Sequence, residues 1–428
     1  MNITEEFHDA RFKTFVLDNF CENREQILAS DVERVTSLKL TNQKFASLKG
    51  IEHFVSLEEL DCAFNSLSEL DISQNTSLKT LDCSGNKLTS LDTSHNPSLE
   101  KLACRNNELS HLDVSFNPLL QELNCNQNTI IDLDLSANAG LKQLDCGFNR
   151  LRTLDVSRNT QLVQLICYWN ILSELQLDQN TKLQELNCSY NALFHLNLEA
   201  NTLLSYLDCG HNHLSSLTIS NCTHLIELRC NNNHLTRLDV AGNPDLRSLR
   251  CFNNHITELE LSHNPLLTEL YCSENKISQL DTQHNSKLER LSHSDNLIVV
   301  PDHTVAGFTT FQYDGSLSYY TAALDYKGKP LSIIVDVHDK ASIERISPVI
   351  EKAWTHFDQL HEQAVQRIAE QHPDEDVNEL VLSTLQFEET GTIRLGYDAG
   401  DTDAGRLYIY AIFNNILELD SQLVYELY

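Results

Sequence analysis

The chain has 428 residues, which is enough for two or three domains. Its 61 acidic residues outnumber its 31 basic residues, and the formal charge of −30 argues against nucleic acid or an anionic membrane as partner. Hydrophobic residues make up 41% of the chain, so it can bury a core. Because no cleavable signal peptide and no apolar run of about 18 residues is recognised, we expect neither export nor a membrane span.

Residues 1–55 predict an N-terminal helical cap followed by a first irregular coil. Residues 9–17 have the apolar spacing of an amphipathic helix, and residues 32–38 lead into the irregular coil. A cap is expected here because the repeats that follow would otherwise expose the apolar face of their first coil.

Residues 56–300 contain twelve repeats of 21 residues, the first starting at Leu57, with no insertion or deletion. Each reads L-x-x-L-x-C-x-x-N-x-L-x-x-L-x-[VILT]-x-x-N-x-x, and we number its positions as places 1 to 21. This period predicts a solenoid in which the L-x-x-L-x-C segments form short parallel strands about 4.8 Å apart. The asparagines at places 9 and 19 are predicted to tie the edges of the coils together by hydrogen bonds. Cys222 replaces the asparagine at one place 19.

This pattern resembles the leucine-rich repeat family over residues 36–300, with cysteine at the third apolar position of the family's L-x-x-L-x-L-x-x-N-x-L core. The resemblance implies an α/β solenoid with a curved parallel sheet of about 12 coils, whose concave surface binds proteins. The cap is similar to that of leucine-rich repeat proteins from Bacteroidetes-type bacteria. Residues 21–27 match the calcium loop of that cap, but Arg24 and Glu25 stand where aspartate and glycine belong, so we expect no calcium.

Eleven of the 13 cysteines recur every 21 residues at place 6, where each replaces a buried leucine. They are Cys62, Cys83, Cys104, Cys125, Cys146, Cys167, Cys188, Cys209, Cys230, Cys251 and Cys272. We interpret them as core residues rather than as a metal site. Thiols stacked at strand spacing could mispair in an oxidising compartment, so a reducing cytoplasm is the expected location.

Places 2, 3, 5, 7 and 8 are predicted to face solvent on the concave surface. Large, rigid apolar side chains gather there in the central coils, and such side chains anchor protein interfaces. Place 5 changes from Asp61 and Asp82 in the early coils to arginine in late coils, so a partner would meet an acidic arm, an aromatic centre and a basic arm. The candidate partner-binding residues are Phe148, Val163, Ile166, Tyr168, Trp169, Tyr190, Tyr206, Arg229, Arg250, Phe252 and Tyr271.

Residues 301–428 predict a separate, acidic α+β domain with 22 acidic and 8 basic residues. We expect two strands around a hairpin at residues 326–329 and one long helix over residues 341–371. Further apolar segments follow at residues 380–387, 392–397, 407–413 and 416–427. The hairpin, helix and late strand resemble uncharacterised bacterial domains found among toxin-immunity proteins.

Motifs for phosphate binding, serine hydrolysis and zinc proteolysis are absent, so we predict no enzyme and no cofactor. Three place-10 histidines, His213, His234 and His255, could bind zinc or nickel if they converged. Polar residues are ordinary at that place, so we favour a solvated ladder and predict no metal.

Several polar groups of residues 301–428 are predicted to have no site role. A hairpin loop is expected at Asp398, Asp401 and Asp403, because turn-forming residues surround them. Ordinary surface positions are expected for His356, His361, Glu388 and Glu389.

We therefore interpret the chain as a monomeric, intracellular bacterial protein that binds and neutralises a protein partner, as an immunity protein does with a toxin. A basic partner is favoured because strong acidity steers association with a basic protein. The alternative is an effector delivered into another cell, with the repeats used for targeting and the C-terminal domain for activity. An enzyme hidden in residues 301–428 is a third hypothesis.

Overall fold

A computed structural model describes residues 1–22, 24–297, 302–314, 317, 319–337, 340–373, 377, 380–402 and 405–427. The chain divides into two compact units, Met1–Ser292 and His293–Tyr428. The predicted boundary between residues 300 and 301 lies outside the described residues. Among the described residues, no helix has both the length and the apolar composition needed to cross a membrane.

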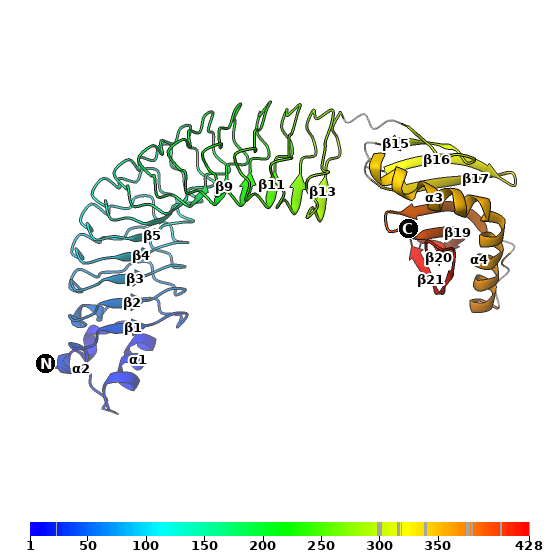
Figure 1. Cartoon of the computed structure of the whole chain (residues 1–428). Coiled ribbons are helices and arrows are strands. Elements are labelled where there is room, and N and C mark those ends of the chain that lie inside the picture. Colours follow the sequence, from blue (N-terminus) through cyan, green and yellow to red (C-terminus); the bar gives the residue numbers. More distant parts are fainter. Residues whose placement is uncertain are drawn as a thin grey trace. The chain divides into compact units, whose positions relative to one another are not determined.

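The first unit is a solenoid with one parallel sheet on its inner, concave side (Figure 1). Its thirteen strands pair in chain order and in register, so that Leu60 lies beside Leu81. This confirms the predicted α/β solenoid. The strands are β1 (Ser37–Lys39), β2 (Glu59–Asp61), β3 (Thr80–Asp82), β4 (Lys101–Ala103), β5 (Glu122–Asn124), β6 (Gln143–Asp145), β7 (Gln164–Ile166), β8 (Glu185–Asn187), β9 (Tyr206–Asp208), β10 (Glu227–Arg229), β11 (Ser248–Arg250), β12 (Glu269–Tyr271) and β13 (Arg290–Ser292).

Short helices cover the first coil. They are η1 (Thr4–Glu6), α1 (Ala10–Phe20), α2 (Ala29–Val32) and η2 (Ile51–His53). The carboxylate of Asp9 caps α1 by accepting the N–H groups of Arg11 and Phe12 at 2.8 and 3.1 Å, and it also accepts the N–H of Ala46 at 2.7 Å. The ring of Phe12 is buried against Phe45, with ring centroids 5.5 Å apart. The helix therefore closes the apolar end of the stack.

The residues that replace the calcium loop are tied to the cap in another way. Arg24 pairs with Asp31 at 2.6 Å, and Asp31 also accepts the N–H of Leu28 at 2.8 Å. Asn23 lies outside the described residues.

Two asparagine columns join each coil to the coil before it. At place 9, Asn86 Nδ2 donates to the carbonyls of Cys62 and Cys83 at 3.1 and 3.0 Å, and its Oδ1 accepts the N–H of Leu67. At place 19, Asn96 Nδ2 donates to two carbonyls of the preceding coil at 2.9 and 3.1 Å. These amides satisfy buried backbone groups that the three-residue strands cannot pair.

The second column leaves a buried acceptor in most coils of the described solenoid. The unpaired Oδ1 atoms belong to Asn75, Asn96, Asn138, Asn159, Asn180, Asn201, Asn243, Asn264 and Asn285. Asn117 differs, because its Oδ1 accepts a hydrogen bond of 2.7 Å from the hydroxyl of Thr93. Cys222 replaces the asparagine in one coil, and its thiol lies 3.6 Å from the carbonyl of Asn201 in the preceding coil.

We predict that Thr93→Val lowers the free energy of unfolding by about 1 kcal/mol, because it leaves the Asn117 acceptor buried and unpaired. The matched variant Val156→Thr places a hydroxyl in the same relation to Asn180 and should leave stability unchanged or raise it. Urea unfolding of both variants measures the difference. Equal losses for the two substitutions would contradict this account.

All thirteen cysteines are buried free thiols. Burial raises their pKa, to about 12 for Cys125 and Cys167. A buried thiol with a raised pKa is a poor nucleophile, because the thiolate is the reactive form. The cysteine column therefore acts as part of the core.

We predict that the free energy of unfolding falls as the pH rises above about 8.5, the usual thiol pKa. An unfolded chain loses thiol protons there while the folded chain keeps them, so alkali favours unfolding. Urea titrations at pH 7 and pH 10 test this, and Cys125→Ala/Cys167→Ala should show a smaller fall. In the folded protein at pH 8, a thiol reagent should react only as fast as the protein unfolds.

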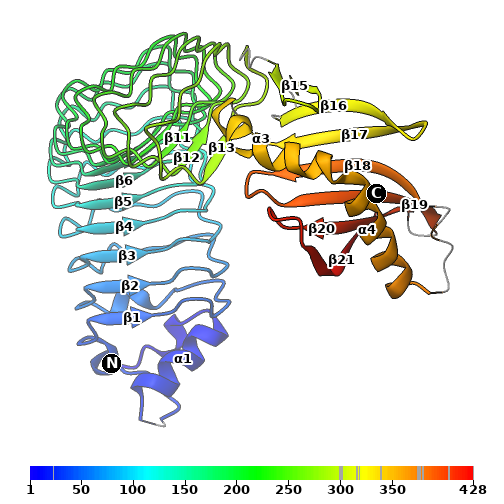
Figure 2. The same ribbon diagram turned by 45° about the vertical axis from the view of Figure 1, so that its right-hand side comes forward.

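The second unit is an eight-stranded sheet in the order β14 to β21, with its two helices packed on one face (Figure 2). All neighbouring strands are antiparallel except β17 and β18, which the helices connect. Its elements are β14 (His303–Thr304), β15 (Thr310–Asp314), β16 (Tyr319–Tyr326), β17 (Lys329–Asp336), α3 (Lys340–Thr355), α4 (Phe357–Gln371), β18 (Val381–Glu388), β19 (Ile393–Thr402), β20 (Gly405–Phe413) and β21 (Leu419–Leu427).

The predicted α+β character is confirmed, but two details of the prediction are wrong. The single long helix is broken at His356, whose backbone leaves the helical region and whose ring bonds to the Lys352 carbonyl. Asp398 and Asp401 lie in β19 around a bulge rather than in a loop, and Asp403 lies outside the described residues. Strands β14 and β15 were not predicted, because their short segments carry no clear alternation.

Candidate partner-binding surface

Only some of the places predicted to face solvent on the concave surface are exposed in each coil. In the strands, place 4 is buried while places 3 and 5 are half-exposed or exposed, as in β7. Place 7 differs from the prediction, because most of its side chains are buried by the neighbouring coils; Ser84 and Ser189 are examples. The inner surface is therefore narrower than the sequence pattern suggests.

Place 8 has a left-handed backbone in every full coil, with φ between 47° and 65°. Glycine, asparagine and aspartate accept this conformation most readily, and they occupy it at Gly85, Asn106 and Asp295 among others. The central coils instead place Phe148, Trp169 and Tyr190 there. A bulky residue in this region costs about 1 kcal/mol or more, so these rings are held against a local preference.

The same turn geometry stacks these side chains on one another. Ring centroids are 5.4 Å apart for Phe148 and Trp169, 4.6 Å for Trp169 and Tyr190, and 3.9 Å for Tyr190 and His211, with interplanar angles of 10°, 15° and 11°. We call these four residues the aromatic ridge. Trp169 is 48% exposed, so the edges of the stacked rings are open to solvent.

His211 ends the ridge and contacts an asparagine of the next coil. Its Nε2 lies 3.1 Å from Nδ2 of Asn232, whose Oδ1 accepts from Asn253 at 2.6 Å. With its oxygen occupied, the Asn232 amide donates to the imidazole. Burial lowers the pKa of His211, and the nearby carboxylate of Asp208 opposes that shift.

Tyr168 lies beside the ridge but is directed back along the sheet. Its ring packs edge-on against Phe148 at 5.1 Å, and its hydroxyl lies 3.3 Å from Nδ2 of Asn126. That amide also donates to Asp145 at 2.9 Å. The ring fits only because Gly147 has no side chain: an added Cβ would lie 2.6 Å from the Tyr168 ring. Tyr168 thus supports the surface more than it projects from it.

The two arginines of the predicted basic arm contact carboxylates and aromatic rings of the protein itself. Arg229 Nε pairs with Glu227 at 2.7 Å, and its guanidinium lies 5.7 Å from the Tyr206 ring centre. Arg250 similarly lies 3.9 Å from the carboxylate of Glu269. It also stacks over Tyr271, 5.1 Å from the ring centre. Both arginines therefore have partners within the protein: Arg229 pairs with a carboxylate of its own coil, and Arg250 contacts a carboxylate of the next coil.

Carboxylates keep the first half of the inner surface acidic. A depression of about 350 Å³ lies over β3 to β7, and its lining includes Asp82, Ala103, Asp145 and Ile166. Burial raises the pKa of Asp145, partly offset by hydrogen bonds from Asn126 and the Gly147 N–H. Within the described residues, Asp145 forms no ion pair. Ile166, which lies beside Asp145 in the sheet, is half-buried, and so is Val163 in the same coil.

The histidine column forms a ladder at the outer side of the turns. His213, His234 and His255 are exposed, with consecutive ring centroids 5.8 and 5.9 Å apart. Their nitrogen atoms do not lie close enough together to hold one metal ion. Among the described residues, the group with such spacing is Glu6, Glu52 and His53. There Glu6 bonds to His53 at 2.8 Å and Glu52 pairs with Lys49 at 2.9 Å, so both carboxylates already have partners.

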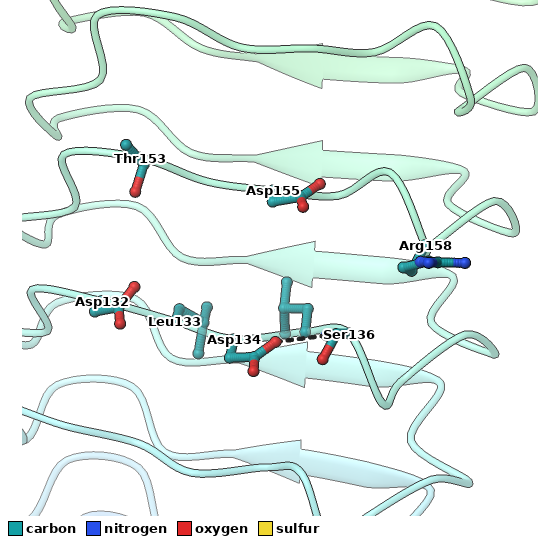
Figure 3. Close-up of a pocket in the computed structure, with 8 residues that line it drawn as sticks. Asp132, Leu133, Asp134, Ser136, Thr153, Asp155 and Arg158 are labelled. Atoms are coloured by element: carbon teal, nitrogen blue, oxygen red, sulfur yellow. Dashed lines mark hydrogen bonds between the residues drawn. The ribbon is translucent and has the colours of Figure 1, made fainter.

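The back of the coils carries a second depression of about 280 Å³ (Figure 3). Its carboxylates are turn residues: Asp134 Oδ1 accepts the N–H of Ser136 at 2.9 Å, and Asp155 bonds in the same way to Ser157. These bonds lower the pKa of both aspartates. We interpret this lining as repeat structure rather than as a binding site.

In the second unit, the predicted surface histidine His361 is half-buried, and its Nδ1 bonds to the Tyr397 hydroxyl at 2.8 Å. Burial raises the pKa of Tyr397 and lowers that of His361. Asp398 accepts from Arg406 Nε at 3.0 Å. We therefore interpret the His361–Tyr397 and Asp398–Arg406 bonds as contacts within the second unit rather than as parts of a binding site.

Glu388 and Glu389 pair with arginines of the second unit. Glu388 lies 3.9 Å from Arg394, and Glu389 bonds to Arg345.

The repeat geometry is shared with known proteins. The family model for the Leucine Rich Repeat matches residues 77–102. The functional domain of InlJ from Listeria monocytogenes, whose structure is described as including a cysteine ladder, is 34% identical, with 71% of this chain and 72% of that chain covered and a TM-score of 0.65. The chain belongs to the leucine-rich repeat family.

Two more distant solved structures share the solenoid fold. The internalin InlF of Listeria monocytogenes is 22% identical, with 69% of this chain and 92% of that chain covered and a TM-score of 0.65. A leucine-rich repeat protein of Leptospira interrogans is 26% identical over 64% of this chain and 75% of that chain, with a TM-score of 0.59. A comparison with curated protein sequences finds no match.

Two exposed apolar residues beside the ridge, Ile171 and Phe194, were not predicted from the sequence; we call them its outer flank. Ile171 at place 10 and Phe194 at place 12 are 51% and 55% exposed, and Phe194 packs against His213 at 5.3 Å. Their signal was available, because these places carry polar residues in most repeats.

We predict that Gly147→Ala disturbs the surface by displacing the Tyr168 ring from its place against Phe148. The near-ultraviolet circular dichroism should change, and the free energy of unfolding should fall by about 1–3 kcal/mol. Gly140→Ala is the matched control, because its Cβ would meet only the Leu120 carbonyl at 3.8 Å. An unchanged spectrum for Gly147→Ala would contradict the packing described for Tyr168.

Proposed function

We propose that this leucine-rich repeat protein is a non-enzymatic binding protein that captures a protein partner on the central coils and neutralises it. The observation that carries the proposal is the exposed stack of Phe148, Trp169 and Tyr190. Rigid aromatic side chains lose little conformational entropy on binding and are enriched among interface anchors. Retaining them in a left-handed backbone is consistent with selection for a function other than folding.

The finer form of the proposal is an immunity protein that acts in the cytoplasm against a basic protein toxin. Its net charge of −30 supports electrostatic attraction of a basic partner. Asp145, which forms no ion pair among the described residues, supports the same preference on the inner surface. The buried thiol column supports a reducing location, because oxidation would disturb the core.

A pull-down from the native cells, with the bound protein identified by mass spectrometry, tests the proposal. An immunity role requires that the captured protein be toxic when expressed alone and harmless when coexpressed. It also requires that deletion of this gene reduce the viability of cells that make the toxin. Detection of the chain inside a foreign cell would instead support an effector.

We predict that Trp169→Ala weakens binding of the captured partner by 10-fold or more, which is about 1.4 kcal/mol or more, by removing an exposed anchor. Phe116→Ala is the control, because Phe116 is 55% exposed but lies at place 18, away from the ridge. Calorimetric titration gives both affinities, and thermal unfolding checks that each variant is folded. Equal affinities of the two variants for the partner would show that the central coils are not the binding surface.

A further inference from the structure

The exposed apolar residues of coils four to seven concentrate on one edge of the solenoid, where the chain turns after each strand. Six of the seven large ones occupy places 8, 10 and 12, namely Ile131, Phe148, Trp169, Ile171, Tyr190 and Phe194; the seventh, Leu203, lies at place 21. The floor of the sheet offers less, because Val163 and Ile166 are half-buried there and Tyr168 is packed inward. The strongest apolar surface is therefore the turn edge rather than the centre of the concave sheet.

The stacking of the ridge limits what can bind to it. Each inner ring has both faces covered by its neighbours at 3.9–5.4 Å, so only ring edges are free. A sugar or a nucleobase would need an open ring face. A protein segment can instead pack side chains against the edges and the gaps between them.

The spacing of the ridge favours a helix over an extended segment. Side chains on one side of an α-helix recur about every 5.4 Å along its axis, whereas those on one side of a strand recur about every 6.7 Å. The separations between consecutive rings are 5.4, 4.6 and 3.9 Å, each nearer to the helical repeat than to the extended one. A helix lying along the ridge can therefore place side chains of successive turns against the rings of successive coils more closely than a strand can.

Charged side chains on the two sides of the ridge indicate which charges a bound helix would carry. On the sheet side, Asp145 is half-buried next to Tyr168 and has no ion pair among the described residues. On the outer side, Arg150 and Arg152 are exposed at places 10 and 12, likewise without an ion pair in the described part of the chain. An amphipathic helix with basic residues along one border and acidic residues along the other matches this arrangement.

We infer that the aromatic ridge, with Ile171 and Phe194 on its flank, binds one amphipathic helix of the protein partner. The apolar stripe of that helix lies along the rings, a lysine or arginine reaches Asp145, and an acidic residue faces Arg150 and Arg152. This inference rests on the proposed function, because it names how the same partner is held.

Photo-crosslinking of the full-length protein to the purified captured partner tests the inference. Benzoylphenylalanine is placed at Ile171 or Phe194, and at Phe116 in the control protein. We expect both ridge positions to crosslink to one partner peptide at residues three or four apart, with no crosslink from position 116. Crosslinks only from position 116, or to an extended segment with alternate-residue spacing, would overturn the helix proposal.

Affinity measurements separate this inference from the proposed function. We expect Tyr190→Ala to weaken binding at least 10-fold, Asp145→Asn to weaken it about 10-fold and Arg150→Glu/Arg152→Glu to weaken it about 10-fold, while Phe116→Ala binds as the unmodified protein does. If Tyr190→Ala binds the partner with wild-type affinity while Gln164→Ala, on the floor of the sheet, loses affinity, the ridge is not the binding site. The proposed capture of a partner would still stand. Failure of the unmodified protein to capture any protein would overturn the proposed function itself.

Discussion

The need to satisfy buried backbone groups between coils controls the first unit. Three-residue strands pair only a small part of each 21-residue coil, so the rest of the backbone needs other partners. Backbone bonds between coils beyond the strands provide some of them. The two asparagine columns provide others, as the amide of Asn86 does for the carbonyls of Cys62 and Cys83. Because each amide reaches into the preceding coil, one inserted residue would break bonds on both sides. The uniform repeat length follows from this constraint.

The same constraint produces the candidate surface. The residue before each place-9 asparagine, which bonds to two coils, has a left-handed backbone, and that turn is repeated in every full coil. Side chains at place 8 are therefore held in one column at coil spacing. Aromatic residues in that column stack, as Trp169 and Tyr190 do at 4.6 Å, and become a rigid ridge. A structural requirement of the repeat thus preorganises groups suited to binding.

Much of the fold was predictable, and the missed features share one physical origin. Periodicity indicated the coils, the buried cysteines and the two asparagine columns, because each depends on spacing along the chain. It did not reveal that Arg229 and Arg250 are paired, since their partners come from neighbouring residues and coils. The break at His356 and the contact of His361 with Tyr397 were also missed, because a helical pattern does not show where two helices separate.

The sequence by itself determined the solenoid, its register and the presence of aromatic residues in the central coils. A strict 21-residue period with apolar residues at fixed places has few ways to bury them other than by stacking coils. Only the tertiary structure decided which of those aromatics are available. Burial depends on what the adjacent coil presents: the absence of a side chain at Gly147 draws Tyr168 inward, while the turn at place 8 holds Trp169 outward.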